Sequence, residues 1–134
     1  MLHPNQYFVN EAWIAFQLND APIQTDLDGT FNCLALMDAA SCFLLGSVFV
    51  EASVDQASPM EVRRLIKEAK AHKNQLPKSF LVAREHAQTS VEREAARLRI
   101  EVVRVPEIEL RLFIAEAQEG FRQHFAAGEP RRIE

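Results

Sequence analysis

The sequence predicts a single α/β domain in which helices cover a mixed sheet. Residues 31–50 (FNCLALMDAASCFLLGSVFV) hold two apolar runs joined by a short turn, which is typical of a hairpin of buried strands. Two Ser/Thr-led helix starts follow at residues 58–61 and 89–92, and short apolar segments follow them at residues 79–83 and 100–105. Alternating helices and strands of this kind indicate right-handed crossovers onto one sheet.

Length and composition agree with a globular domain. The chain has 134 residues, of which 48% are hydrophobic and 25% charged, and these values argue against a disordered chain. The apolar runs are far shorter than the roughly 18 residues of a membrane-spanning helix. The opening MLHPNQYF lacks the basic start of a secretory signal. We therefore expect a cytoplasmic, non-membrane protein with one domain over residues 1–134, a core at residues 11–127 and frayed ends.

The two cysteines are expected to be free thiols. A turn centred on residues 39–40 sets Cys42 opposite Met37 and Cys33 opposite Gly46, several residues out of register. A disulfide needs Cα atoms within about 7 Å. Neither a CxxC motif nor a nearby His indicates a metal or redox site.

Charge is distributed unevenly along the chain. All fifteen Lys and Arg residues follow residue 62, whereas the first 62 residues carry acids only. The bases at residues 63–78 are interpreted as the solvated face of a helix, since no aromatic residues alternate with them to stack on bases. Nucleic-acid binding is therefore possible but not favoured, and a protein partner or self-association is expected.

The helices and their limits follow from local signals. Ser58 and Glu61 form a capping box with Pro at the first helical position, and the segment ends at residues 76–77. Residues 89–92 (TSVE) predict a second capping box. A long terminal helix begins at Glu107 and stops at residues 128–130; the expected buried stripe is Leu110, Ile114, Ala117, Phe121 and Phe125.

The beginning of the chain allows two interpretations. Residues 11–18 (EAWIAFQL) indicate a strand anchored by Trp13, although a helix after Asn10 is an alternative. Residues 22–27 are consistent with a short strand before the Asp28-Gly29 turn, and residues 22–28 are the other candidate for the first sheet strand.

The predicted order, β-β-β-α-β-α-β-α, resembles the ribonuclease H-like fold with its three layers. Several local features resemble its integrase and transposase branch: Trp13 opening the first strand, residues 34–41 (LALMDAAS), residues 43–46 (FLLG) and the polar turn at residues 86–90 (HAQTS). The resemblance covers residues 11–125.

The resemblance implies carboxylates that hold two divalent ions, Mg²⁺ or Mn²⁺. They would come from the middle of the first strand, the end of the fourth strand and the last helix. The position three residues after the Trp is Phe16, which cannot ligate a hard cation. At the fourth strand the position falls on Arg84 or Glu85, and on the last helix Glu116 or Glu119 could supply an acid.

An incomplete set of acids favours a scaffold that is not catalytic. We expect a binding or interaction module without a cofactor, whose partner contacts Tyr7, Phe8 and Trp13 in the acidic N-terminal segment. The alternative is a divalent-metal-dependent nuclease or phosphoryl-transfer enzyme. For that role Asp26 or Asp28, rather than making a turn, would join Glu85 and Glu116.

A third interpretation is a small-ligand site at the carboxyl ends of the first and fourth strands. Arg84 would then pair with an anion, and His86 would serve as a ligand or proton carrier.

Overall fold

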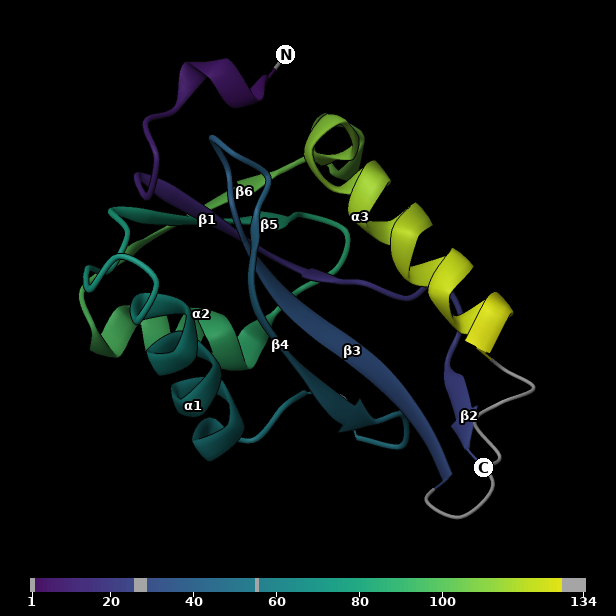
Figure 1. Cartoon of the computed structure of the whole chain (residues 1–134). Coiled ribbons are helices and arrows are strands. Elements are labelled where there is room, and N and C mark those ends of the chain that lie inside the picture. The colour runs from purple at the N-terminus through teal and green to yellow at the C-terminus, as the bar shows by residue number, and fades with distance from the viewer. Residues whose placement is uncertain (1, 26–28, 55, 129–134) are drawn as a thin grey trace.

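The computed structural model describes residues 2–25, 29–54 and 56–128, in which a mixed sheet lies between helices (Figure 1). In chain order the elements are the 3-10 helix η1 (Pro4–Gln6), β1 (Ala12–Gln17), β2 (Ile23–Thr25), β3 (Gly29–Asp38), β4 (Leu44–Glu51), α1 (Pro59–Lys70), β5 (Ser79–Ala83), α2 (Thr89–Arg97), β6 (Glu101–Val105) and α3 (Glu107–Gly128).

β1 lies in the middle of the sheet. The strand order is β2-β3-β1-β5-β6, and β4 pairs with the other edge of β3. β1 runs antiparallel to β3, with Trp13 opposite Asp38, and parallel to β5, with Trp13 opposite Phe80. Five of its six residues are buried, as expected for a strand whose two faces are both covered.

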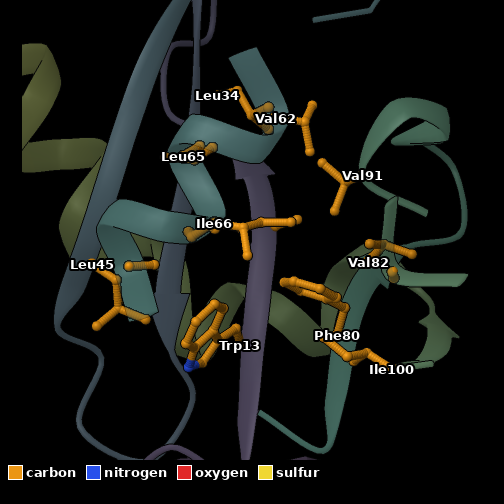
Figure 2. Close-up of a cluster of buried hydrophobic side chains, with 14 of the residues drawn as sticks. Trp13, Leu34, Leu45, Val62, Leu65, Ile66, Phe80, Val82, Val91 and Ile100 are labelled. Atoms are coloured by element: carbon orange, nitrogen blue, oxygen red, sulfur yellow. The ribbon is translucent and has the colours of Figure 1, made fainter. Parts of the chain in front are cut away.

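Helices cover both faces of the sheet. α1 and α2 lie on one face, and α3 crosses the other (Figure 1). Under α1 and α2, the rings of Trp13 and Phe80 meet edge to face at 5.8 Å, and Ile66 lies among the side chains around them (Figure 2). Under α3, the fully buried Phe113 packs in a cluster with residues of β1 and β3. The sheet is therefore the middle layer of three.

The expected hairpin forms, but only one of its strands is central. β3 lies between β4 on one edge and β1 and β2 on the other, whereas β4 is an edge strand with alternating exposure. The turn is longer than expected, so Met37 pairs with Leu44 and not with Cys42, and a bulge between Leu36 and Met37 shifts the register by one more residue; Cys33 therefore lies opposite Phe49 and not opposite Gly46. The prediction of two buried strands was wrong for β4, because its apolar residues alternate between a packed face and an open one.

Local signals explain the start of α1 but not that of α2. Ser58 and Glu61 form the expected capping box, with Ser58 Oγ accepting from the Glu61 N–H at 3.1 Å. In α2, Thr89 is already helical and the N-cap is Gln88, which makes no side-chain cap hydrogen bond. The second predicted capping box was wrong because tertiary contacts take its groups: Ser90 Oγ donates to the Ala57 carbonyl, and Glu92 pairs with a β6 arginine.

The first strand of the sheet comes from the earlier of the two candidate segments. Residues 12–17 form the strand predicted over residues 11–18, and β2 adds the short strand, with Ile23 opposite Phe31.

Cys33 and Cys42 are free, as expected; Cys33 is buried and Cys42 half-buried. Asp26, Asp28 and the side chain of Phe125 lie outside the described residues. In the described ranges, no helix has the length and apolar character needed to cross a bilayer.

Candidate functional site

A cavity of about 400 Å³ opens at the carboxyl ends of β1 and β5. These neighbouring strands are parallel, and the chain leaves them in opposite directions, from β1 toward β2 and β3 and from β5 toward β6. A crevice forms at such a point of divergence, where ligands of open α/β sheets bind. The volume lies in the usual range of small-molecule sites, roughly 300–1,000 Å³.

Apolar side chains from three elements line part of this cavity. Phe16 comes from β1, Ala83 from the end of β5, and Leu110 and Ile114 from the buried face of α3. Phe16 is only 5% exposed and belongs to the core cluster under α3. The position from which the resemblance expects a carboxylate is therefore filled by packed aromatic surface.

Amides make up most of the polar wall. Gln118 of α3 donates from Nε2 to the Gln17 carbonyl at 3.0 Å, and Gln17 donates to the Asn19 carbonyl at 2.8 Å. The first bond holds the end of β1 against α3, and the second fixes the turn that follows β1. The amide side chains that line the cavity are those of Gln17, Asn19, Asn32, Gln56, Gln88 and Gln118.

Asn19 is the most deeply placed of these amides. It is buried, its Oδ1 accepts from the Cys33 N–H at 2.7 Å, and its Nδ2 donates at 2.9 Å to both the Ala21 carbonyl and Asn32 Oδ1. Because its hydrogen bonds join the loop after β1 to β3, Asn19 fixes the shape of the wall. Asn32 and Gln118 extend this wall along the cavity.

The charged groups of the cavity are already paired. Asp20 Oδ2 accepts from Arg122 Nη2 at 2.7 Å, and His86 Nε2 lies 3.2 Å from Glu107 Oε2. None of the described lining residues is Lys or Arg. An amide offers both donors and acceptors, which suits an uncharged polar ligand, and without Lys or Arg among the described lining residues the wall does not compensate an anion.

Glu85 serves the start of α3. Its Oε1 accepts from the Glu107 N–H at 2.9 Å, and this backbone hydrogen bond is the main cause that lowers the pKa of Glu85 below its ordinary value. An acid at this place also compensates the positive end of the helix dipole. The position of Glu85 is thus explained by helix capping.

Glu116 lies far from Glu85. It is nine residues beyond Glu107 on α3, which corresponds to about 13 Å along the helix axis. The pKa of the Cys42 thiol at the β3–β4 turn is raised mainly by burial, then by the charge of Asp38, and third by the charge of Glu116. Glu119, the alternative acid on α3, pairs with Arg122. The acids predicted on β5 and α3 therefore do not converge.

Within the described ranges, no group of three His, Cys, Asp or Glu side chains is placed to hold a metal ion. Asp26 and Asp28, proposed in the alternative interpretation, are outside these ranges. Asp38, by contrast, is buried in the turn, where its carboxylate accepts from the Asn10 and Ser41 N–H groups and from the Ser41 hydroxyl.

The predicted anion site is only partly assembled. His86 lines the cavity, whereas Arg84 is exposed and lies outside the described residues that line it. The backbone N–H of Arg84 donates to the Val105 carbonyl, which extends the pairing of β5 with β6. The arginine therefore does not supply a positive charge to the cavity wall.

The three aromatic residues expected to contact a partner differ in exposure. Trp13 is fully buried, and its Nε1 donates to Asn10 Oδ1 at 2.8 Å, so it is not available to a partner. Tyr7 is half-buried and packs edge to face on Phe113. Phe8 is 82% exposed and is the accessible member of the set.

Sequence reasoning missed the amides of the cavity. Gln17 ends a buried apolar strand, and Gln118 follows Ile114 by four residues, on the stripe that faces the sheet. Polar residues at such positions are a usable signal. Asn32 gives no comparable signal, because its place in the wall depends on the pairing of β3 with its neighbours.

No family model matches the chain, and no curated protein matches its sequence. Among solved structures, it is similar to a chain of the simian T-cell lymphotropic virus intasome in complex with PP2A regulatory subunit B56 gamma. That match has 12% identity and a TM-score of 0.56, and it covers 88% of this chain but only 42% of the other.

A further similarity is to the HTLV-2 integrase catalytic core domain in complex with magnesium, in its dimeric form. It has 9% identity and a TM-score of 0.48, and it covers 81% of this chain and 82% of that one. At identities this low, structural similarity is evidence about the fold alone. The first match, with its TM-score of 0.56, supports a shared fold. The chain has a mixed α/β fold that resembles the ribonuclease H-like fold of retroviral integrases.

Proposed function

We propose that this chain is a non-catalytic binding module on a ribonuclease H-like scaffold, with its ligand site in the cavity at the ends of β1 and β5. The observation that carries the proposal is the lining of that cavity. Phe16 occupies the place on β1 where the resemblance expects a carboxylate, Ala83 and Gln118 line the cavity beside it, and Glu85, Glu116 and Glu119 are not among its described lining residues.

The wall also supports a class of ligand. Asn19 and Gln56 are bonded within the chain through both the oxygen and the nitrogen of their amides, so the donors and acceptors for a ligand come mainly from the other four lining amides. The two carboxylates, Asp20 and Glu107, face cationic or titratable partners of their own. The ligand is a small molecule with several uncharged hydrogen-bonding groups and an apolar face that contacts Leu110 and Ile114. Such a ligand pairs with the wall without leaving a buried charge unmatched.

The metal-dependent alternative has weaker support. Glu85 already accepts the first N–H of α3, and Glu116 is near the opposite turn. Using Glu85 as a metal ligand would remove a cap, and neither acid is among the described residues that line the cavity.

Ala83→Leu tests the proposal by filling the cavity. Ala96→Leu is the matched control, because it adds the same atoms on the exposed surface of α2. We expect ligand-detected NMR with a library of small uncharged polar compounds to find binders of the natural chain. Their signals should be lost in Ala83→Leu and kept in Ala96→Leu.

Two outcomes would contradict the proposal. One is that no member of the uncharged polar library binds the natural chain. The other is that binders are retained equally by both variants, which would place their site elsewhere. Both variants should first show the same cooperative thermal unfolding as the natural chain, so that lost binding is not lost folding.

A further inference from the structure

The outer edge of β4 is unpaired within the described part of the chain. β4 pairs with β3 on one side and packs under α1 on one face, and no described strand continues the sheet beyond it (Figure 1). Monomeric proteins protect such edges with Lys, Pro or inward-pointing charges. Residues 42–50 (CFLLGSVFV) contain none of these. The bulge beside Leu45 protects only the beginning of the strand.

Exposure alternates along this edge strand. Phe49 is 50% exposed and lies opposite Cys33, which belongs to the core cluster under α3. Val48 and Val50 point to the other face and pack against the cluster under α1 and α2. One large aromatic side chain is therefore left half uncovered at the rim of the sheet.

Register determines which backbone groups face outward. The Ala52 N–H donates to the Thr30 carbonyl, and hydrogen-bonded pairs alternate along an antiparallel ladder. Val50 and Val48 therefore bond to β3, whereas the N–H and C=O groups of residues 47, 49 and 51 point to the open edge.

We propose that a second copy of this chain pairs antiparallel along β4, with the two-fold axis at Phe49. Phe49 then lies opposite Phe49 of the second copy, so each ring covers the other. Ser47 lies opposite Glu51 of the second copy, and no two like charges meet across the new pair. This register leaves the apolar centre of the strand paired with itself and puts its one carboxylate beside a hydroxyl.

Charge on α1 favours a second copy over another peptide. A Cβ at position 46 would lie 2.9 Å from Glu68 Oε1, so Glu68 flanks β4. Helical spacing puts Arg64 and Glu61 on the same flank, while Arg63 faces α2 through its bond to Glu94. A two-fold axis beside β4 brings the two α1 flanks toward each other. A flank that carries both signs can then match itself.

Substituting Ser47 with a negative or a positive residue tests the proposed register, because the two charges should have opposite effects on dimerisation. Ser47→Glu would face Glu51 of the second copy, whereas Ser47→Lys would face it with the opposite charge. Analytical ultracentrifugation of the natural chain should show a monomer–dimer equilibrium. We expect Ser47→Glu to raise the dissociation constant about two- to fivefold and Ser47→Lys to lower it by a similar factor, both less so at high salt.

A second pair of variants tests the surface. Phe49→Lys should abolish the dimer, while Leu112→Lys, which alters a 55% exposed apolar residue on α3, should not. Amide hydrogen exchange at residues 47, 49 and 51 should slow as the protein concentration rises.

The proposal is overturned if the natural chain is monomeric at every concentration. It is also overturned if Ser47→Glu and Ser47→Lys change the dissociation constant in the same direction. A dimer that survives Phe49→Lys but is lost in Phe8→Lys would place self-association at the N-terminal segment instead of β4. None of the substituted positions is among the described residues that line the cavity, so failure of the dimer and failure of ligand binding can be told apart.

Discussion

Glu94 shows how a single buried charge holds two helices. Its side chain is 6% exposed, and it accepts from Arg97 on α2 and, at 3.2 Å, from Arg63 on α1. The hydrogen bond from Arg97, and then that from Arg63, keeps the pKa of this carboxyl below its ordinary value despite burial, which acts in the opposite direction. Glu94 lies three residues after Val91 and next to Ala95, so helical spacing puts it on the buried side of α2, whereas its partner Arg63 on α1 is not evident from that spacing.

Glu94→Gln is expected to lower the free energy of unfolding at neutral pH by about 1–2 kcal/mol, because charge-assisted bonds to half-exposed arginines become neutral ones. A carboxyl with a lowered folded-state pKa stabilises the fold fully above its unfolded pKa, about 4.3, and loses this effect as pH falls through the lower folded-state value. Urea unfolding at neutral pH and in acid measures this. The difference between Glu94→Gln and the natural chain should shrink in acid.

Glu101→Gln, which alters an exposed carboxylate of β6, is the control and should change the free energy of unfolding little at either pH. A Glu94→Gln deficit that grows as the pH falls would contradict the assigned direction of the pKa shift.

Among the secondary-structure elements, local sequence signals predicted a helix start correctly where no tertiary contact took the capping side chains. The capping box of α1 forms from four consecutive residues, so the sequence predicts it directly. The same pattern at residues 89–92 fails because Ser90 bonds to the Ala57 carbonyl and Glu92 reaches Arg104. The position of β4 at the edge of the sheet could not be predicted from the sequence either, because an apolar run does not show whether another strand pairs beyond it.

Ser58→Ala and Thr89→Ala separate these two helix starts. Ser58→Ala removes a cap bond and should lower the free energy of unfolding by about 1 kcal/mol. Thr89→Ala alters a helical position with no cap role and should change it by less than about 0.5 kcal/mol. Urea unfolding measures both. Equal losses would contradict the assignment of Gln88 as the N-cap of α2.

At the scale of the whole molecule, element order predicted more than site chemistry. Strand and helix periodicity, with Trp13 as anchor, was enough to predict a covered mixed sheet and the resemblance that the structural comparison supports. The cavity could not be predicted in the same way, because it depends on which strand ends and which part of α3 lie next to one another. Gln17 and Gln118 are 101 residues apart and become neighbours only because α3 crosses the end of β1.

The central claim is that the carboxyl ends of β1 and β5 form an amide-lined ligand site and not a metal centre. One nitrogen–proton NMR spectrum reports on both possibilities, because the side-chain amides of Gln17, Asn32 and Gln118 line the cavity. Uncharged polar binders are expected to shift these three signals, and paramagnetic Mn²⁺ is expected to leave them unbroadened. Saturable Mn²⁺ broadening centred on the same signals and lost in Glu85→Ala would contradict the claim.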